Sequence, residues 1–209
     1  MRTDNAPAKG RAIAVHPFDY TCQLDDLIHH IIHHSEPFRH VDPKAVLTSW
    51  SQSRAQGEQG VYATIQCLRF FDGSETVKRG TREYRWPKVT FEGREILYVI
   101  FFMLPRYADL SFRSKLTTIF HELYHVDPEC NGGLRRFPGR NYAHGHSREA
   151  YNARLQPWID AYLLHPAAAE KTEFLNLTFR DLEARHRVVT GRRVKVVKPQ
   201  LVRPSATPL

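Results

Sequence analysis

The chain has 209 residues, 42% of them hydrophobic and 25% charged, and these ordinary fractions exclude a disordered or a fibrous protein. The longest apolar run, residues 96–104, is too short for a membrane span of roughly 20 residues. The N-terminus lacks the continuous apolar segment of a secretory signal. We therefore expect a cytoplasmic protein. The formal net charge of +8 is concentrated near the C-terminus, because seven Lys and Arg residues and no acidic residue follow Glu183.

A first helix is predicted over residues 21–34, and Pro37 follows its end. Apolar residues recur along it at the spacing of one helix face: Leu24, Leu27, Ile28 and Ile31. Two pairs of histidines, His29 with His33 and His30 with His34, are also four residues apart. No Glu lies between the members of either pair, and isoleucines share their helix surface. We therefore interpret these histidines as solvated or structural.

Strand-like segments follow the first helix. Three segments are rich in β-branched and aromatic residues: Ala45–Trp50, Val61–Phe70 and Glu95–Phe102. Glycines punctuate the polar connections around them, as is typical of turns. The order of elements so far predicts a helix followed by a small sheet.

A second helix is predicted to begin after Ser111, a typical N-cap residue, and it must end by Asp127 because Pro128 cannot continue it. Its apolar residues occupy one face, and His121 and His125 point away from that face. The apolar face consists of Phe112, Leu116, Ile119, Phe120 and Leu123.

This second helix carries the sequence HELYH at residues 121–125. Because residues four apart lie one turn apart on the same side of a helix, His121 and His125 can place ring nitrogens on one zinc ion. Glu122 beside them can accept a proton from a water molecule whose pKa the zinc lowers to about 7. The motif therefore indicates metal-assisted hydrolysis with Glu122 as the catalytic general base. The alternative is a pair of surface histidines that bind no metal.

A catalytic zinc site usually has three protein ligands, so one more ligand is needed. A long loop is predicted over residues 128–143, and three candidates lie just beyond it: His144, His146 and Glu149. Glu149 lacks the ExxxD continuation of zincins with a Glu ligand, because Ala153 stands where the acid should be. Asp127 lies so close to the helix end that we interpret it as an acceptor that orients a ligating histidine.

The remaining sequence predicts two more helices and a basic end. A helical pattern begins at Ser147, although Pro157 should kink or divide it. A short helix with a capping-box pattern is predicted over residues 178–185. Valines between residues 188 and 197 predict an edge strand, and we expect the Pro-containing end after it to be loose. The basic charge there suits an anionic partner such as nucleic acid, or serves only solubility.

Residues 121–147, HELYHVDPECNGGLRRFPGRNYAHGHS, resemble the active-site stretch of the phage-type metallopeptidase family and of SprT-like proteases. Those enzymes carry HExxH, a loop and a His-Gly pair whose histidine is the third zinc ligand, a pattern that His144-Gly145 matches. The resemblance implies an α+β minimal zincin fold: an N-terminal helix, a small mixed sheet and the active-site helix. It also implies that an edge strand, for which we select Glu95–Phe102, holds an extended peptide. Unlike SprT-like proteases, this chain has no cysteine-pair zinc ribbon after the protease region.

We therefore predict a zincin-like metallopeptidase domain over residues 20–187, between an N-terminal arm of residues 1–19 and a basic tail of residues 188–209. A peptide or protein is the predicted substrate, and no membrane is involved. One rival function is a nucleic-acid-associated protein with a structural or inactive zinc site and a working basic tail. Another is a zinc hydrolase acting on a different bond, such as a cell-wall cross-link.

The predicted zinc ligands are His121, His125 and His144, and His146 is the closest rival for the third position. The glycine after His144 lets the backbone turn tightly and approach the metal, whereas His146 immediately precedes the N-cap of the following helix. Arg140 and Tyr142 flank this segment and are candidates for stabilising an oxyanion.

Overall fold

The computed structural model describes residues 17–52, 60–138, 143 and 148–202. The helices are α1 (Tyr20–His34), α2 (Phe112–Tyr124), α3 (Arg148–Leu163), α4 (Ala168–Thr172) and α5 (Phe179–His186), with 3-10 turns at Glu36–Phe38, Pro43–Ala45 and Glu173–Asn176. The strands are β1 (Phe18–Asp19), β2 (Val46–Gln52), β3 (Ala63–Cys67), β4 (Thr76–Arg79), β5 (Arg82–Arg85), β6 (Val89–Phe91), β7 (Arg94–Ile96), β8 (Tyr98–Leu104), β9 (Val189–Thr190) and β10 (Gln200–Leu201). The predicted α+β class is confirmed. Within the described part of the chain, no helix is long and apolar enough to cross a membrane.

The central sheet has three strands in the order β2-β8-β3. Strand β8 pairs parallel with β2 and antiparallel with β3, so the sheet is mixed. The prediction that the segment Glu95–Phe102 forms an edge strand is wrong, because most of that segment belongs to β7 and to β8, the middle strand. The run is apolar without alternation because both faces of β8 are covered: Ile100 and Phe102 pack in one core cluster, and Val99 and Phe101 in another.

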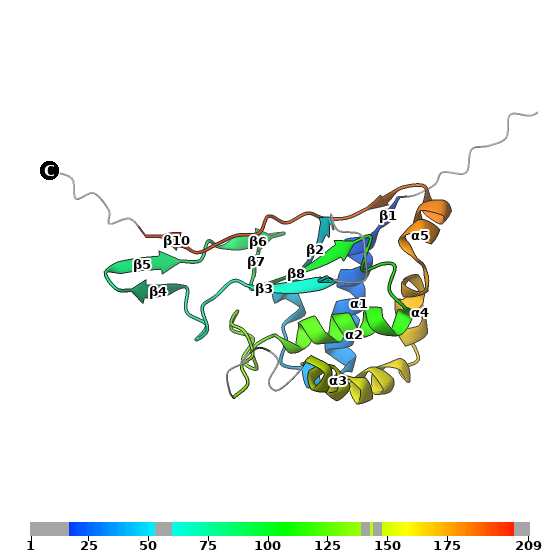
Figure 1. The fold of residues 1–209 in the computed structure, drawn as a ribbon, viewed down its shortest axis with the longest axis horizontal. Helices are drawn as coiled ribbons and strands as arrows, with labels where there is room; N and C mark the ends of the chain where they lie inside the picture. Colours follow the sequence, from blue (N-terminus) through cyan, green and yellow to red (C-terminus); the bar gives the residue numbers. More distant parts are fainter. Residues whose placement is uncertain (1–16, 53–59, 139–142, 144–147, 203–209) are drawn as a thin grey trace, which may run out of the picture.

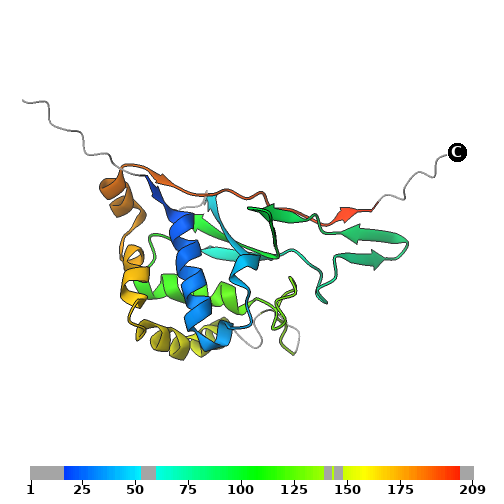
Figure 2. The ribbon, with the colours of Figure 1, turned by 180° about the vertical axis from the view of Figure 1, so that it is seen from behind.

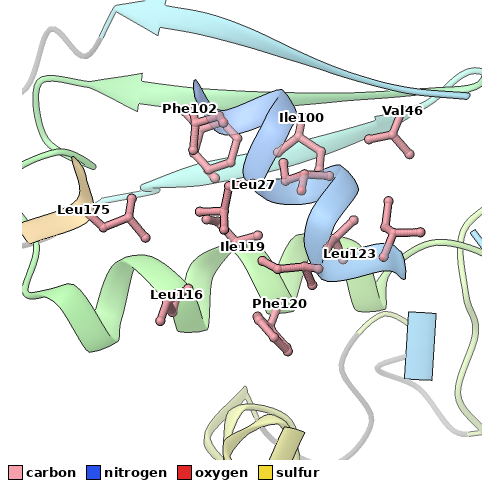
Figure 3. Close-up of a cluster of buried hydrophobic side chains, with 14 of the residues drawn as sticks. Leu27, Val46, Ile100, Phe102, Leu116, Ile119, Phe120, Leu123 and Leu175 are labelled. Atoms are coloured by element: carbon pink, nitrogen blue, oxygen red, sulfur yellow. The ribbon is translucent and has the colours of Figure 1, made fainter. Parts of the chain in front are cut away.

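The first of these clusters is the main core, and it is formed where α1 and α2 pack against one face of the sheet (Figures 1 and 2). Figure 3 shows its interior, where Leu27 of α1 lies between Phe102 of β8 and Ile119 of α2. Helix α1 begins where the Asp19 carboxylate accepts a hydrogen bond from the backbone amide of Cys22 at 2.9 Å. The apolar face that the sequence predicts for this helix is thus buried in the core between the sheet and α2.

The helices after α2 pack on different parts of the fold: α3 on α2, α4 on α1 and α3, and α5 beside β9. Helix α3 packs along α2 (Figure 1) and passes through Pro157 as one continuous helix, so the prediction that this proline divides it is wrong. The helix continues through Pro157 because the packing of α3 against α2 stabilises it on one side. Helix α5 begins with the predicted capping box between Thr178 and Asp181.

The second face of the sheet is covered by the C-terminal segment, residues 188–202, which runs across it toward β10 (Figure 1). Strand β9 pairs with β1, the Trp50 amide of β2 donates to the Arg192 carbonyl oxygen at 2.7 Å, and β10 pairs with β5. Val194 and Val197 pack against the second core cluster. The expectation that the Pro-containing end is loose is wrong for residues 198–202, because β10 pairs with β5 and the Val202 amide donates to the Glu83 carbonyl oxygen at 2.9 Å.

Candidate metal centre

Helix α2 is held so that one side of its last turn faces α3. The Ser111 hydroxyl caps the N-terminus by accepting from the Ser114 amide at 3.2 Å. The apolar side faces the sheet, where Leu116, Ile119 and Leu123 are fully buried. Helix α2 ends at Tyr124, with His125 as the C-cap residue.

The loop after α2 is fixed to this end of the helix. The backbone amide of Arg135 donates to the His125 carbonyl oxygen at 2.8 Å, and Val126 forms a β-bridge with Leu134. These contacts satisfy a carbonyl that the end of the helix would leave without a partner. The position of His125 is therefore set from both sides, by the helix and by the returning loop.

The two histidines of the motif point their outer ring nitrogens at each other. The Nε2 atoms of His121 and His125 lie 3.1 Å apart. Two ring nitrogens that each lie about 2.0–2.1 Å from a tetrahedral zinc ion are about 3.3–3.4 Å apart. The pair thus fits two positions of a zinc coordination sphere with almost no movement.

Two neighbouring residues of α3 contact the inner ring nitrogens. His121 Nδ1 donates to the Asn152 Oδ1 atom at 2.7 Å, so in this neutral tautomer the lone pair is on Nε2. The Tyr151 hydroxyl lies 3.4 Å from His125 Nδ1, and the two rings stack with centroids 5.3 Å apart. Ligating histidines commonly have such partners, which fix the tautomer and the ring orientation.

Sequence reasoning missed the roles of Asn152 and Tyr151. It gave the orienting role to Asp127, but that carboxylate accepts from the backbone amide of Glu129 at 2.9 Å, in the turn after the helix. No local signal in the sequence marks Asn152 or Tyr151, because their contacts with the two histidines arise from the packing of α3 on α2.

Burial distinguishes this centre from a pair of surface histidines. The exposed fraction of His121, Glu122 and His125 is 5% each, because α3 covers the side of α2 that faces away from the sheet. Burial, reinforced by the charge of Glu122, raises the pKa of Tyr151 far above its ordinary value. The Tyr151 hydroxyl therefore stays protonated at neutral pH.

A cavity of about 460 Å³ opens beside the two catalytic-motif residues His121 and Glu122. It lies between α2, α3 and the start of β3, and its wall includes Gly60, Tyr62, Ala63, Arg113, Thr117, Thr118, Asn152 and Gln156. The backbone of β3 beside it pairs only with β8, so one edge of β3 has no strand partner among the described residues. The cavity thus borders both the motif and a free strand edge.

The proposed third ligand, His144, lies outside the described residues, as do its rival His146 and the oxyanion candidates Arg140 and Tyr142. The third contender, Glu149, is exposed on the first turn of α3. Of the predicted site residues, the structure therefore describes His121 and His125, with Glu122 beside them in the sequence.

A second group of histidines lies elsewhere. His30 and His34 of α1 come together with His165, which follows α3. The ligand atoms of the three side chains lie within 4.8 Å of one another, so they also could hold a metal ion. The sequence brings His30 and His34 to one face of α1, but it gives no indication that His165 joins them.

Comparison with known proteins identifies the family. The family model of putative phage metallopeptidases matches residues 18–157, a stretch that runs from β1 into α3 and includes the HExxH helix. No curated protein and no solved structure matches the chain. The family implies a metal, and the HExxH centre supplies ligands and a carboxylate of the kinds that a metallopeptidase uses. Since the model covers well over half of the chain, the protein belongs to the putative phage metallopeptidase family.

Proposed function

We propose that the protein is a zinc-dependent metallopeptidase in which His121, His125 and His144 hold the zinc ion and Glu122 is the general base. The observation that carries this proposal is the convergence of the two buried Nε2 atoms, 3.1 Å apart, next to a carboxylate at the wall of a cavity. A site that served only structure would have no need of a carboxylate base beside its ligands, and a fourth protein ligand would tend to close it. The SprT-like His-Gly match supports His144 over His146 as the third ligand.

The roles of the chain's own residues follow from their positions. When bound, zinc acts as a Lewis acid that lowers the pKa of a water molecule to about 7. The Glu122 carboxylate accepts the proton of that water and returns it to the leaving amine. Asn152 and Tyr151 hold the two imidazoles in the orientation in which Nε2 faces the metal position.

An extended peptide fits the edge of β3 that has no strand partner in the described part of the chain. A substrate strand added there would form main-chain hydrogen bonds, and the side chains that face the cavity would select its sequence. The start of β3 lines the same cavity as Glu122, so a peptide bond on this edge would lie near the base. Strand β3 therefore replaces the Glu95–Phe102 segment as the proposed substrate-binding edge.

The variant Glu122→Gln tests the proposal. Gln keeps the shape of Glu but cannot accept the proton, so the variant should retain zinc and fold while its turnover of a fluorogenic peptide library falls by a factor of about 100 or more. Glu183→Gln, an exposed position on α5, is the matched control and should retain wild-type turnover. Wild-type turnover in Glu122→Gln would remove Glu122 from its role.

Nucleic-acid binding is the second candidate function, and the distribution of exposed basic side chains favours it. The ribbon of β4 and β5 carries exposed Lys78, Arg79, Arg82 and Arg85, and the C-terminal segment carries exposed Arg193, Lys195 and Lys198. This ribbon extends away from the helical part of the molecule (Figure 2). Such a basic surface suits the phosphate backbone. Deleting residues 188–209 would uncover the sheet, so charge substitutions on the ribbon are the appropriate test.

A further inference from the structure

The three histidines His30, His34 and His165 join two parts of the fold. His30 and His34 lie one turn apart on α1, with ring centroids 4.3 Å apart. The ring of His165 lies 4.9 Å from that of His30 and 4.1 Å from that of His34. The cluster therefore connects the C-terminal half of α1 to the turn that follows α3.

The cluster has partners of the kind found around metal ligands. His30 Nδ1 lies 2.8 Å from the hydroxyl of Tyr162, a buried residue of α3. With the neutral hydroxyl as acceptor, His30 presents its Nε2 lone pair to the cluster. His165 Nδ1 accepts from the Ala167 amide at 3.2 Å, so binding through Nε2 requires its proton to move to Nδ1 and this hydrogen bond to open.

We propose that His30, His34 and His165 form a second metal site, for zinc or a similar divalent transition metal, separate from the HExxH centre. Three imidazoles are a typical ligand set for such ions, and solvent would supply the remaining position. The ligand atoms lie within 4.8 Å of one another, whereas ligands of one tetrahedral ion lie about 3.3–3.4 Å apart, so small side-chain rotations close the site.

The two centres contact different turns of α3. Asn152 contacts His121 of the HExxH centre, and Tyr162 contacts His30 of the second site. Asn152 and Tyr162 are ten positions apart, which corresponds to about 15 Å of helix. A metal at the second site would link α1 to the end of α3, and it should stabilise the packing of the helix that orients the HExxH histidines.

The experiment uses the untagged full chain with His121→Ala and His125→Ala, which removes the HExxH ligands. After chelation and dialysis against zinc, this variant should retain about one zinc per chain, and its melting temperature should rise with zinc. Adding His34→Ala, an exposed position, should remove both effects. Adding His33→Ala instead, at the neighbouring exposed histidine outside the cluster, should leave both unchanged.

The proposal is overturned if the folded His121→Ala/His125→Ala variant binds no zinc, or if its zinc content is the same with and without His34→Ala. If that background does not fold, the otherwise wild-type chain replaces it, and visible absorption of bound Co²⁺ counts the sites. Two equivalents in the wild type and one in His34→Ala support the second site, whereas equal counts overturn it. Peptidase activity enters neither measurement, so failure here is distinct from failure of the proposed catalytic function.

Discussion

The hydrogen bond from His121 Nδ1 to Asn152 is short at 2.7 Å, and it gives the sharpest test of how α3 prepares the HExxH centre. Asn152→Ala removes the acceptor and leaves a ring N–H without a partner beside α3. Loss of such an orienting partner typically lowers metal affinity by 10–100-fold, which corresponds to about 1.4–2.7 kcal/mol. We expect a decrease of this size in zinc affinity, with peptidase turnover at saturating zinc reduced less.

The assay is competition for zinc against a chromophoric chelator, with circular dichroism to verify the fold. Asn152→Asp keeps an acceptor oxygen in place and should restore zinc affinity to at least the wild-type value. Gln156→Ala, one turn further along α3 on the wall of the same cavity, should leave zinc affinity unchanged. Among the described residues, this side chain hydrogen-bonds Arg113, Thr117 and the backbone carbonyl of Asn152, and no histidine. Zinc affinity within threefold of wild type in Asn152→Ala would refute the proposed role of this hydrogen bond.

Burial lowers the pKa of Lys115 to about 8, below the value of about 10.4 for an exposed lysine. Between pH 8 and pH 10 the unfolded chain therefore binds more protons than the folded chain, so the free energy of unfolding should rise with pH. In urea titrations, the free energy of unfolding of the wild type should increase relative to that of Lys115→Met from pH 8 to pH 10. A difference between the two proteins that does not change with pH would contradict this. On the basic ribbon, the double substitution Arg79→Glu with Arg82→Glu should weaken binding to a fluorescent DNA duplex, measured by anisotropy, and should reduce the salt dependence of that binding. The control Arg94→Glu, in the β6–β7 hairpin, should leave DNA binding unchanged. Equal binding by the two variants would leave the ribbon without this function.

The helices were predictable because their signals are local. Capping residues and apolar periodicity place α1, α2 and α5 to within a few residues, and the HExxH spacing places the motif on one turn. Strand order is a different kind of information. The apolar run of β8 predicts a strand, but only its pairing with β2 and β3 shows that it lies in the middle of the sheet.

The features that the sequence did not predict depend on distant contacts. Strands β4 to β7 are short and polar, with glycine turns between them, so no window shows a clear period. Asn152 and His165 acquire their neighbours only when α3 packs against α2 and α1. Such pairs are separated by tens to more than a hundred residues, and a single sequence contains no record of them.

The position of the C-terminal segment affects how the chain folds during its synthesis. Strands β1 and β9, from opposite ends of the described chain, pair with each other, and Val194 and Val197 pack against the core cluster that contains Leu47 and Phe101. Until residue 197 has left the ribosome, a growing chain that has already made its HExxH helix still exposes part of that apolar sheet face. A gene shortened after the family-matched region would leave this part permanently uncovered, and its product should aggregate rather than accumulate as a smaller folded protein.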